Sequence, residues 1–200
     1  MSSIIINEDR NIIIFFSFSV YGTLKRLKFF WPYLSNKNPK IGKFEQTPFH
    51  FVASHGLSDI TYFMLEEPQG AVEYYLCENG GSITPLHNAS RNGNPEIIRC
   101  LQRKIDFEFI NKKWLKHSLE EAVIYGHSDC VKALLEKLSL KFKKSLATEF
   151  VFRCTCKVMN KDTGKYEAKH LNAVATVENY YSFTKTQNHY EILQYLSQCY

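Results

Sequence analysis

Histidines and cysteines are the residues of this sequence whose types and spacing could do chemistry. His50 ends the tetrapeptide TPFH and His87 ends TPLH, so one pattern occurs twice with a histidine in each copy. A histidine can act as a general acid, a general base or a metal ligand at physiological pH. Two histidines share a proton or a metal ion only when the fold brings their rings together.

Two combinations of cysteine and histidine could form a reactive or metal-binding site. Cys154 and Cys156 with His170 resemble zinc ligands, but a structural zinc site needs four converging ligands, and the usual cysteine pairs are separated by two to four residues. Cys130 with His127, or Cys154 with His170, could supply a nucleophile and a base, but their neighbours include nothing that would activate a thiolate. The sequence also lacks a phosphate-binding glycine loop and a metal-binding helix motif. We therefore predict no catalytic residue, no metal site and no cofactor, and a protein that is not an enzyme.

The composition is that of a folded protein, since 44% of the 200 residues are hydrophobic and 22% are charged. The six cysteines have no disulfide-framework spacing and follow no secretory signal, which favours reduced thiols and a cytoplasmic location. The apolar segment 1–20 is interrupted by Glu8 and Asp9, and its second apolar run is too short to cross a bilayer. We expect this segment to join the core and the chain to have no membrane span.

The two TPxH segments belong to a longer repeat. Each threonine is followed nine residues later by a glycine, and the same spacing relates Ile13 to Gly22 and His117 to Gly126. The resulting period is about 33 residues. Threonine suits a helix N-cap, proline suits the first helical position, and glycine suits the C-terminal cap. We expect first helices to begin near Pro48, Pro85 and Ser118, and each to end at its glycine.

A second helix follows each glycine, with apolar residues at matching positions that form a stripe on one side. Such a two-helix unit cannot bury its stripe alone, so the units must stack. Small residues in the first helices allow neighbouring helices to approach closely. The stripe residues are Leu27, Phe30 and Trp31, then Ile60, Met64 and Leu65, then Ile97, Ile98 and Leu101, then Val131, Leu134 and Leu135, and the small residues are Ala53, Ala89, Ser90 and Ala122.

The period and the motifs of residues 13–136 resemble those of ankyrin repeats. The resemblance implies an all-α ankyrin-repeat solenoid of about four to six stacked helix–turn–helix units. Residues 1–140 would hold a degenerate N-terminal capping repeat and three recognisable units that start near 47, 84 and 117. Residues 141–200 would form degenerate repeats or a helical C-terminal cap. There, HYEILQYLSQC resembles a second repeat helix with a stripe of Ile192, Leu193 and Leu196, and TEFVFRCTCKVMNKD resembles a degenerate unit, followed by a loop at 160–165.

The resemblance implies a structural role for both histidines, which in ankyrin repeats form local hydrogen bonds at the turn into the first helix. It also implies a concave face lined by the exposed positions of the first helices, with the preceding turns as fingers. Aromatic and arginine side chains on such a face are typical of binding hot spots. For the finger aromatics, packing between adjacent fingers is the alternative to binding. The predicted partner-binding residues are Phe44 and Trp114 on two fingers, and Phe51, His55, Arg91, Asn92 and Tyr125 on the first helices.

These features predict a non-enzymatic, monomeric module that binds another protein, without a small-molecule substrate and without nucleic acid. The irregular repeats and the composition rich in Ile, Asn and Lys resemble ankyrin effectors of intracellular bacteria, which implies a host protein as partner and secretion without a Sec signal peptide. One alternative is an adaptor that binds nucleic acid or acidic lipid through the lysine-rich stretches 111–117 and 136–144. Another is a cysteine-dependent enzyme in the C-terminal third.

Overall fold

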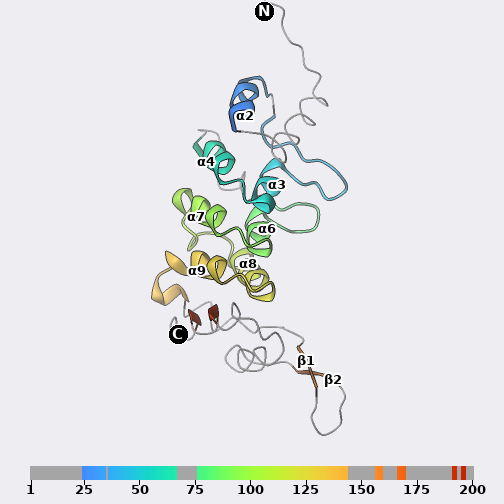
Figure 1. Ribbon diagram of the computed structural model, residues 1–200, viewed down its shortest axis with the longest axis vertical. Helices are drawn as coiled ribbons and strands as arrows, with labels where there is room; N and C mark the ends of the chain where they lie inside the picture. The colour runs from blue at the N-terminus through green and yellow to red at the C-terminus, as the bar shows by residue number, and fades with distance from the viewer. Residues whose placement is uncertain are drawn as a thin grey trace, which may run out of the picture.

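The computed structural model describes residues 24–34, 36–66, 76–143, 156–159, 166–169, 191–192 and 195–196. Most of this described part consists of short helices that follow one another in pairs (Figure 1). The predicted first helix of the N-terminal unit, at 13–22, lies outside the described residues. The helices are α2 (Leu24–Phe30) with the 3-10 turn η1 (Trp31–Tyr33), α3 (Pro48–His55), α4 (Ser58–Glu66), α6 (Pro85–Arg91), α7 (Pro95–Lys104), α8 (Lys112–Ile124) and α9 (Ser128–Glu136).

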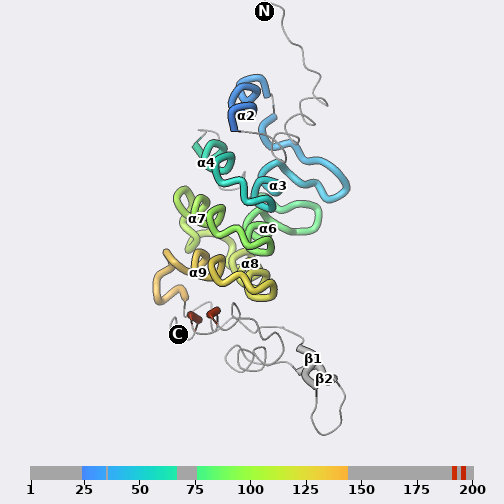
Figure 2. The backbone as a smooth tube through the Cα atoms, in the orientation of Figure 1, coloured from blue at the N-terminus to red at the C-terminus, as the bar shows by residue number. Residues whose placement is uncertain are grey.

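The helices form two parallel rows that run along a stack (Figures 1 and 2). The first helices α3, α6 and α8 pack against one another in sequence order, and the second helices α2, α4, α7 and α9 do the same. Within each pair, α3 packs on α4, α6 on α7 and α8 on α9. This arrangement confirms the predicted all-α solenoid.

Threonine and histidine side chains begin two of the first helices. The backbone N–H of Thr84 donates to His87 Nδ1 over 2.8 Å, and the N–H of His87 donates back to the Thr84 hydroxyl over 3.4 Å. The equivalent capping box joins Thr47 to His50. Because these bonds satisfy backbone donors that the helix leaves open, the helices begin where the sequence predicts.

Glycine allows the turns that end the first helices. Gly56 caps α3 with φ +66°, in the left-handed region that favours glycine. Gly93 has φ +71° and follows the α6 cap residue Asn92, and a Cβ at Gly93 would lie 2.7 Å from the ring of His127. The glycine therefore provides both the left-handed turn and the space for the histidine of the next unit.

Helix α8, the third of the first helices, begins earlier than predicted. Helix α8 starts at Lys112 rather than near Ser118, because the Asn111 side chain caps it by accepting the N–H of Lys113 over 3.0 Å. Trp114 therefore lies in the first turn of α8. Its predicted place on a finger is wrong.

The buried stripe follows the predicted positions. All of its members except Phe30, which is half-buried, are less than 9% exposed, and the four small residues of the first helices are completely buried. The stripe therefore supplies the core between the two rows.

Within the described ranges, no helix is long and apolar enough to cross a bilayer.

Ala89→Leu should destabilise the protein by about 1–3 kcal/mol, because three extra carbons must fit where α6 meets its neighbours. Ala89 is completely buried, and its carbonyl oxygen lies 3.9 Å from the Cys130 thiol of α9. Urea unfolding of wild type and variant measures the change. An unchanged midpoint would mean that α6 and α9 are not packed as described.

The C-terminal third contains a pair of strands that was not predicted. Strand β1 (Cys156–Met159) pairs antiparallel with β2 (Tyr166–Lys169), and β1 lies where we expected part of a degenerate helical unit. The expected loop at 160–165 lies outside the described residues. Ile192 and Leu196 are helical and buried in the core, whereas Leu193 is not described.

Candidate functional site

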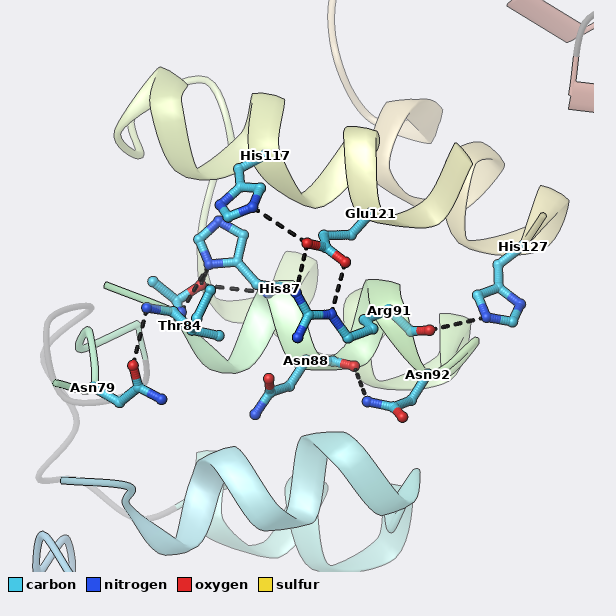
Figure 3. Close-up of polar contacts among 10 residues, drawn as sticks. Asn79, Thr84, His87, Asn88, Arg91, Asn92, His117, Glu121 and His127 are labelled. Carbon is cyan, nitrogen blue, oxygen red and sulfur yellow. Dashed lines mark hydrogen bonds and ion pairs between the residues drawn. The ribbon is translucent and has the colours of Figure 1, made fainter. Parts of the chain in front are cut away.

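A bidentate ion pair joins α6 to α8 on the row of first helices (Figure 3). Arg91 donates from Nε and from Nη2 to the two carboxylate oxygens of Glu121, each over 2.7 Å. The Glu121 side chain is 8% exposed and that of Arg91 is 42% exposed. The hydrogen bonds from Arg91 lower the pKa of Glu121, so the carboxylate is charged at neutral pH. The pair holds the guanidinium in one orientation at the surface.

Tyr125 extends this surface at the end of α8. The Arg91 guanidinium lies 6.0 Å from the centre of the Tyr125 ring, at the range of a cation–π contact. The Tyr125 ring stacks on that of His127, with centroids 6.4 Å apart, and His127 Nε2 donates to the Arg91 carbonyl over 3.0 Å. Since Tyr125 is 53% exposed, an aromatic ring and an arginine from successive units form one accessible surface.

His87 and His117 lie beside this pair, as Figure 3 shows. Their ring centroids are 4.4 Å apart, and His117 Nε2 lies 3.3 Å from Glu121 Oε1. Burial, and then the nearby His117, lower the pKa of His87 to about 4. His87 is therefore neutral at pH 7, and its Nδ1 can accept the hydrogen bond of the capping box.

The Nε2 atoms of His50 and His87, the two TPxH histidines, have different surroundings. His50 Nε2 donates to the carbonyl of Ile83 over 2.9 Å, and burial lowers the pKa of His50. The position equivalent to Ile83 in the next unit is Lys116, which already belongs to α8 because that helix begins early. His87 Nε2 has no hydrogen-bond partner within the described ranges. Each histidine bonds to the threonine of its own unit, so the two do not form a shared site.

Helix α3 joins the surface through polar contacts. Asn88 donates its side-chain N–H to the His50 carbonyl over 3.3 Å, and Asn92 donates to the Asn88 carbonyl over 2.8 Å. His55 is exposed and its Nδ1 lies 2.9 Å from the carbonyl of the half-buried Phe51. Five of the predicted residues thus lie on three neighbouring first helices or at the C-terminal caps of those helices. We call this set the first-helix surface: Phe51, His55, Arg91, Asn92 and Tyr125.

The two predicted finger aromatics have different environments. Phe44 is 61% exposed in the turn between Ile41 and Gln46, and its carbonyl accepts the N–H of Gly80 in the next finger. Trp114 is half-buried against the core, and its indole N–H donates to Glu78 over 2.6 Å. The structure therefore brings Phe44 to the rim of the stack and uses Trp114 to connect α8 to the preceding unit.

The thiols of Cys100 and Cys130 are not activated. Burial, with a smaller contribution from Asp129, raises the pKa of Cys130 to about 12, and burial also raises the pKa of Cys100. Cys154 and His170 lie outside the described residues, and Cys156 begins β1. No group of three metal-ligating side chains occurs among the residues described.

The lysine-rich stretches make contacts within the chain. Lys112 lies 5.5 Å from the centre of the Phe142 ring, and Lys137 donates to the Gln102 carbonyl over 3.3 Å. Trp114, the aromatic residue of the first stretch, is partly covered by the core. The ring that would stack on a nucleic-acid base is therefore not displayed openly.

A family model for ankyrin repeats, described as three copies, matches residues 68–145. The matched range contains α6, α7, α8 and α9 in full, and therefore the pair of Arg91 with Glu121 and the neighbouring Tyr125.

Proposed function

Because this chain is an ankyrin-repeat protein, we propose that it binds a partner protein through its first-helix surface. Ankyrin repeats are protein–protein interaction modules and generally have no enzymatic activity. The family resemblance supports the assignment of this row of helices to the concave face of the stack. A fold alone does not identify a binding surface, so the assignment depends on the side chains present there.

The observation that carries the proposal is the fixed, exposed guanidinium of Arg91. Two hydrogen bonds to a buried carboxylate hold it in place, and Tyr125 lies beside it. A side chain that is already ordered loses less entropy when a partner binds. Arginine and tyrosine are also among the residues that dominate binding energies at protein interfaces. Asn92 and His55 add exposed polar side chains to the first-helix surface.

We also propose a monomer that works in the cytoplasm, with a protein of a host cell as its partner. The composition rich in Ile, Asn and Lys supports a host-directed effector, and the unpaired, buried thiols of Cys100 and Cys130 support a reducing compartment. Fusion of the chain to a reporter that is active only in the host cytoplasm tests delivery. Delivery that depends on a Sec-type signal peptide would contradict the proposed route.

Affinity capture from a cell lysate, with and without nuclease, tests the proposed function against nucleic-acid binding. We expect capture of a protein that persists after nuclease treatment. This capture should be lost with the double variant Tyr125→Ala, Asn92→Ala. Tyr33→Ala is the matched control, since Tyr33 is an exposed tyrosine outside the first-helix surface. Capture that disappears with nuclease, and with Lys137→Glu, Lys141→Glu and Lys143→Glu together, would favour the nucleic-acid alternative instead.

A further inference from the structure

Helix α2 lies at one end of the described stack (Figure 1). One side of the segment is buried, because Leu27 is 0% and Trp31 is 5% exposed. Phe29 and Tyr33, in contrast, are 66% and 63% exposed, and their ring centroids lie 6.4 Å apart. Adjacent exposed rings bordered by polar side chains are typical of a surface that contacts another protein or a membrane.

Basic side chains accompany these rings in the same segment. Lys25, Arg26 and Lys28 are all exposed, and no acidic residue occurs in the segment 24–33. Lys28 Nζ lies 5.5 Å from the centre of the Phe63 ring of α4, so this cation is held against the neighbouring helix. The segment thus combines apolar rings with positive charge over a short distance.

We propose that α2 and η1 form a docking surface for an anionic lipid bilayer. Phe29 and Tyr33 enter the interface between lipid headgroups and acyl chains, where aromatic rings are favoured. Lys25 and Arg26 contact the headgroups, and each basic residue near such a surface increases the affinity about fivefold. Because the cations are few and the inserted area is small, docking is reversible and weakens as salt is added. This inference does not depend on the proposed protein partner.

Sedimentation of the full chain with phosphatidylcholine vesicles, with and without phosphatidylserine, tests the proposal. We expect binding only to the vesicles that contain phosphatidylserine, with loss of binding as the salt concentration rises. Lys25→Glu with Arg26→Glu should weaken binding by at least about tenfold, since two attractive charges become repulsive. Phe29→Ser with Tyr33→Ser should weaken it by a similar factor.

Matched controls separate this surface from others. Tyr125→Ser removes an exposed ring elsewhere on the stack, and Lys137→Glu, Lys141→Glu and Lys143→Glu change more charge in the second lysine-rich stretch; neither variant should change vesicle binding. The proposal is overturned if wild type binds equally to vesicles with and without phosphatidylserine. It is also overturned if only the variant of the second lysine-rich stretch loses vesicle binding. It is also overturned if Phe29→Ser with Tyr33→Ser lowers the melting temperature, because the rings would then be covered by the chain itself, or if those substitutions abolish a dimer seen by light scattering.

Discussion

The protein should lose about 3 kcal/mol of unfolding free energy through His87 as the pH falls from 6.5 to about 4. Burial and the neighbouring His117 disfavour the charged form of His87 in the folded state. The unfolded chain therefore binds a proton at a higher pH than the folded chain does. The contribution of His87 to stability is complete above pH 6.5 and is lost progressively below it.

Urea unfolding at several pH values between 7 and 4 measures this loss. His87→Gln keeps an acceptor for the N–H of Thr84 but cannot titrate. We expect this variant to be less stable than wild type at pH 7 and to lose less stability on acidification. His50→Gln is the parallel variant, because burial also lowers the pKa of His50. Parallel pH profiles for wild type and His87→Gln would contradict the account of the buried cluster.

Arg91→Met should destabilise the protein by about 2 kcal/mol at pH 7, because it leaves the nearly buried Glu121 carboxylate without its bidentate partner. His117 Nε2, at 3.3 Å, is the remaining side-chain contact that the structure records for that carboxylate. The unfolding free energy from urea titration gives the size of the effect.

Glu121→Gln completes a double-mutant cycle with Arg91→Met. The double variant should recover more than half of the stability lost in Arg91→Met, because the uncompensated charge is then absent. Lys132→Met is a control, since Lys132 is paired with Asp129 where both side chains are well exposed, and such pairs contribute little. Additive effects of Arg91→Met and Glu121→Gln would mean that the pair is not coupled in solution.

The sequence was sufficient to locate the helices that begin with a strong local signal. Thr-Pro with a histidine three residues after the threonine predicted the starts of α3 and α6, and the capping boxes show why. No such motif precedes α8. The signal that was overlooked is Asn111, a good N-cap residue, followed by Leu115 and Leu119 at helical spacing. Placing Trp114 on a finger followed directly from that error.

The ion pair at the centre of the site was harder to predict. Arg91 and Glu121 are 30 residues apart and occupy different positions within their repeats. Only a comparison of neighbouring units, one helical turn out of register, brings them together. In the C-terminal third, the turn-forming residues Asn160, Asp162 and Gly164 between two short segments were the available signal for a hairpin. That signal was outweighed by the expectation that the repeats continue.

Calorimetric titration of the captured partner tests the central claim most directly, which is that partner binding occurs on the first-helix surface. The comparison is between wild type, the double variant Tyr125→Ala with Asn92→Ala, and the control Tyr33→Ala, each with its melting temperature measured. Tyr125 and Asn92 are exposed, so the double variant should remain folded. We predict that its affinity falls at least about thirtyfold, or about 2 kcal/mol, while Tyr33→Ala binds like wild type. Undiminished affinity in the folded double variant would contradict the claim and place the binding surface elsewhere on the chain.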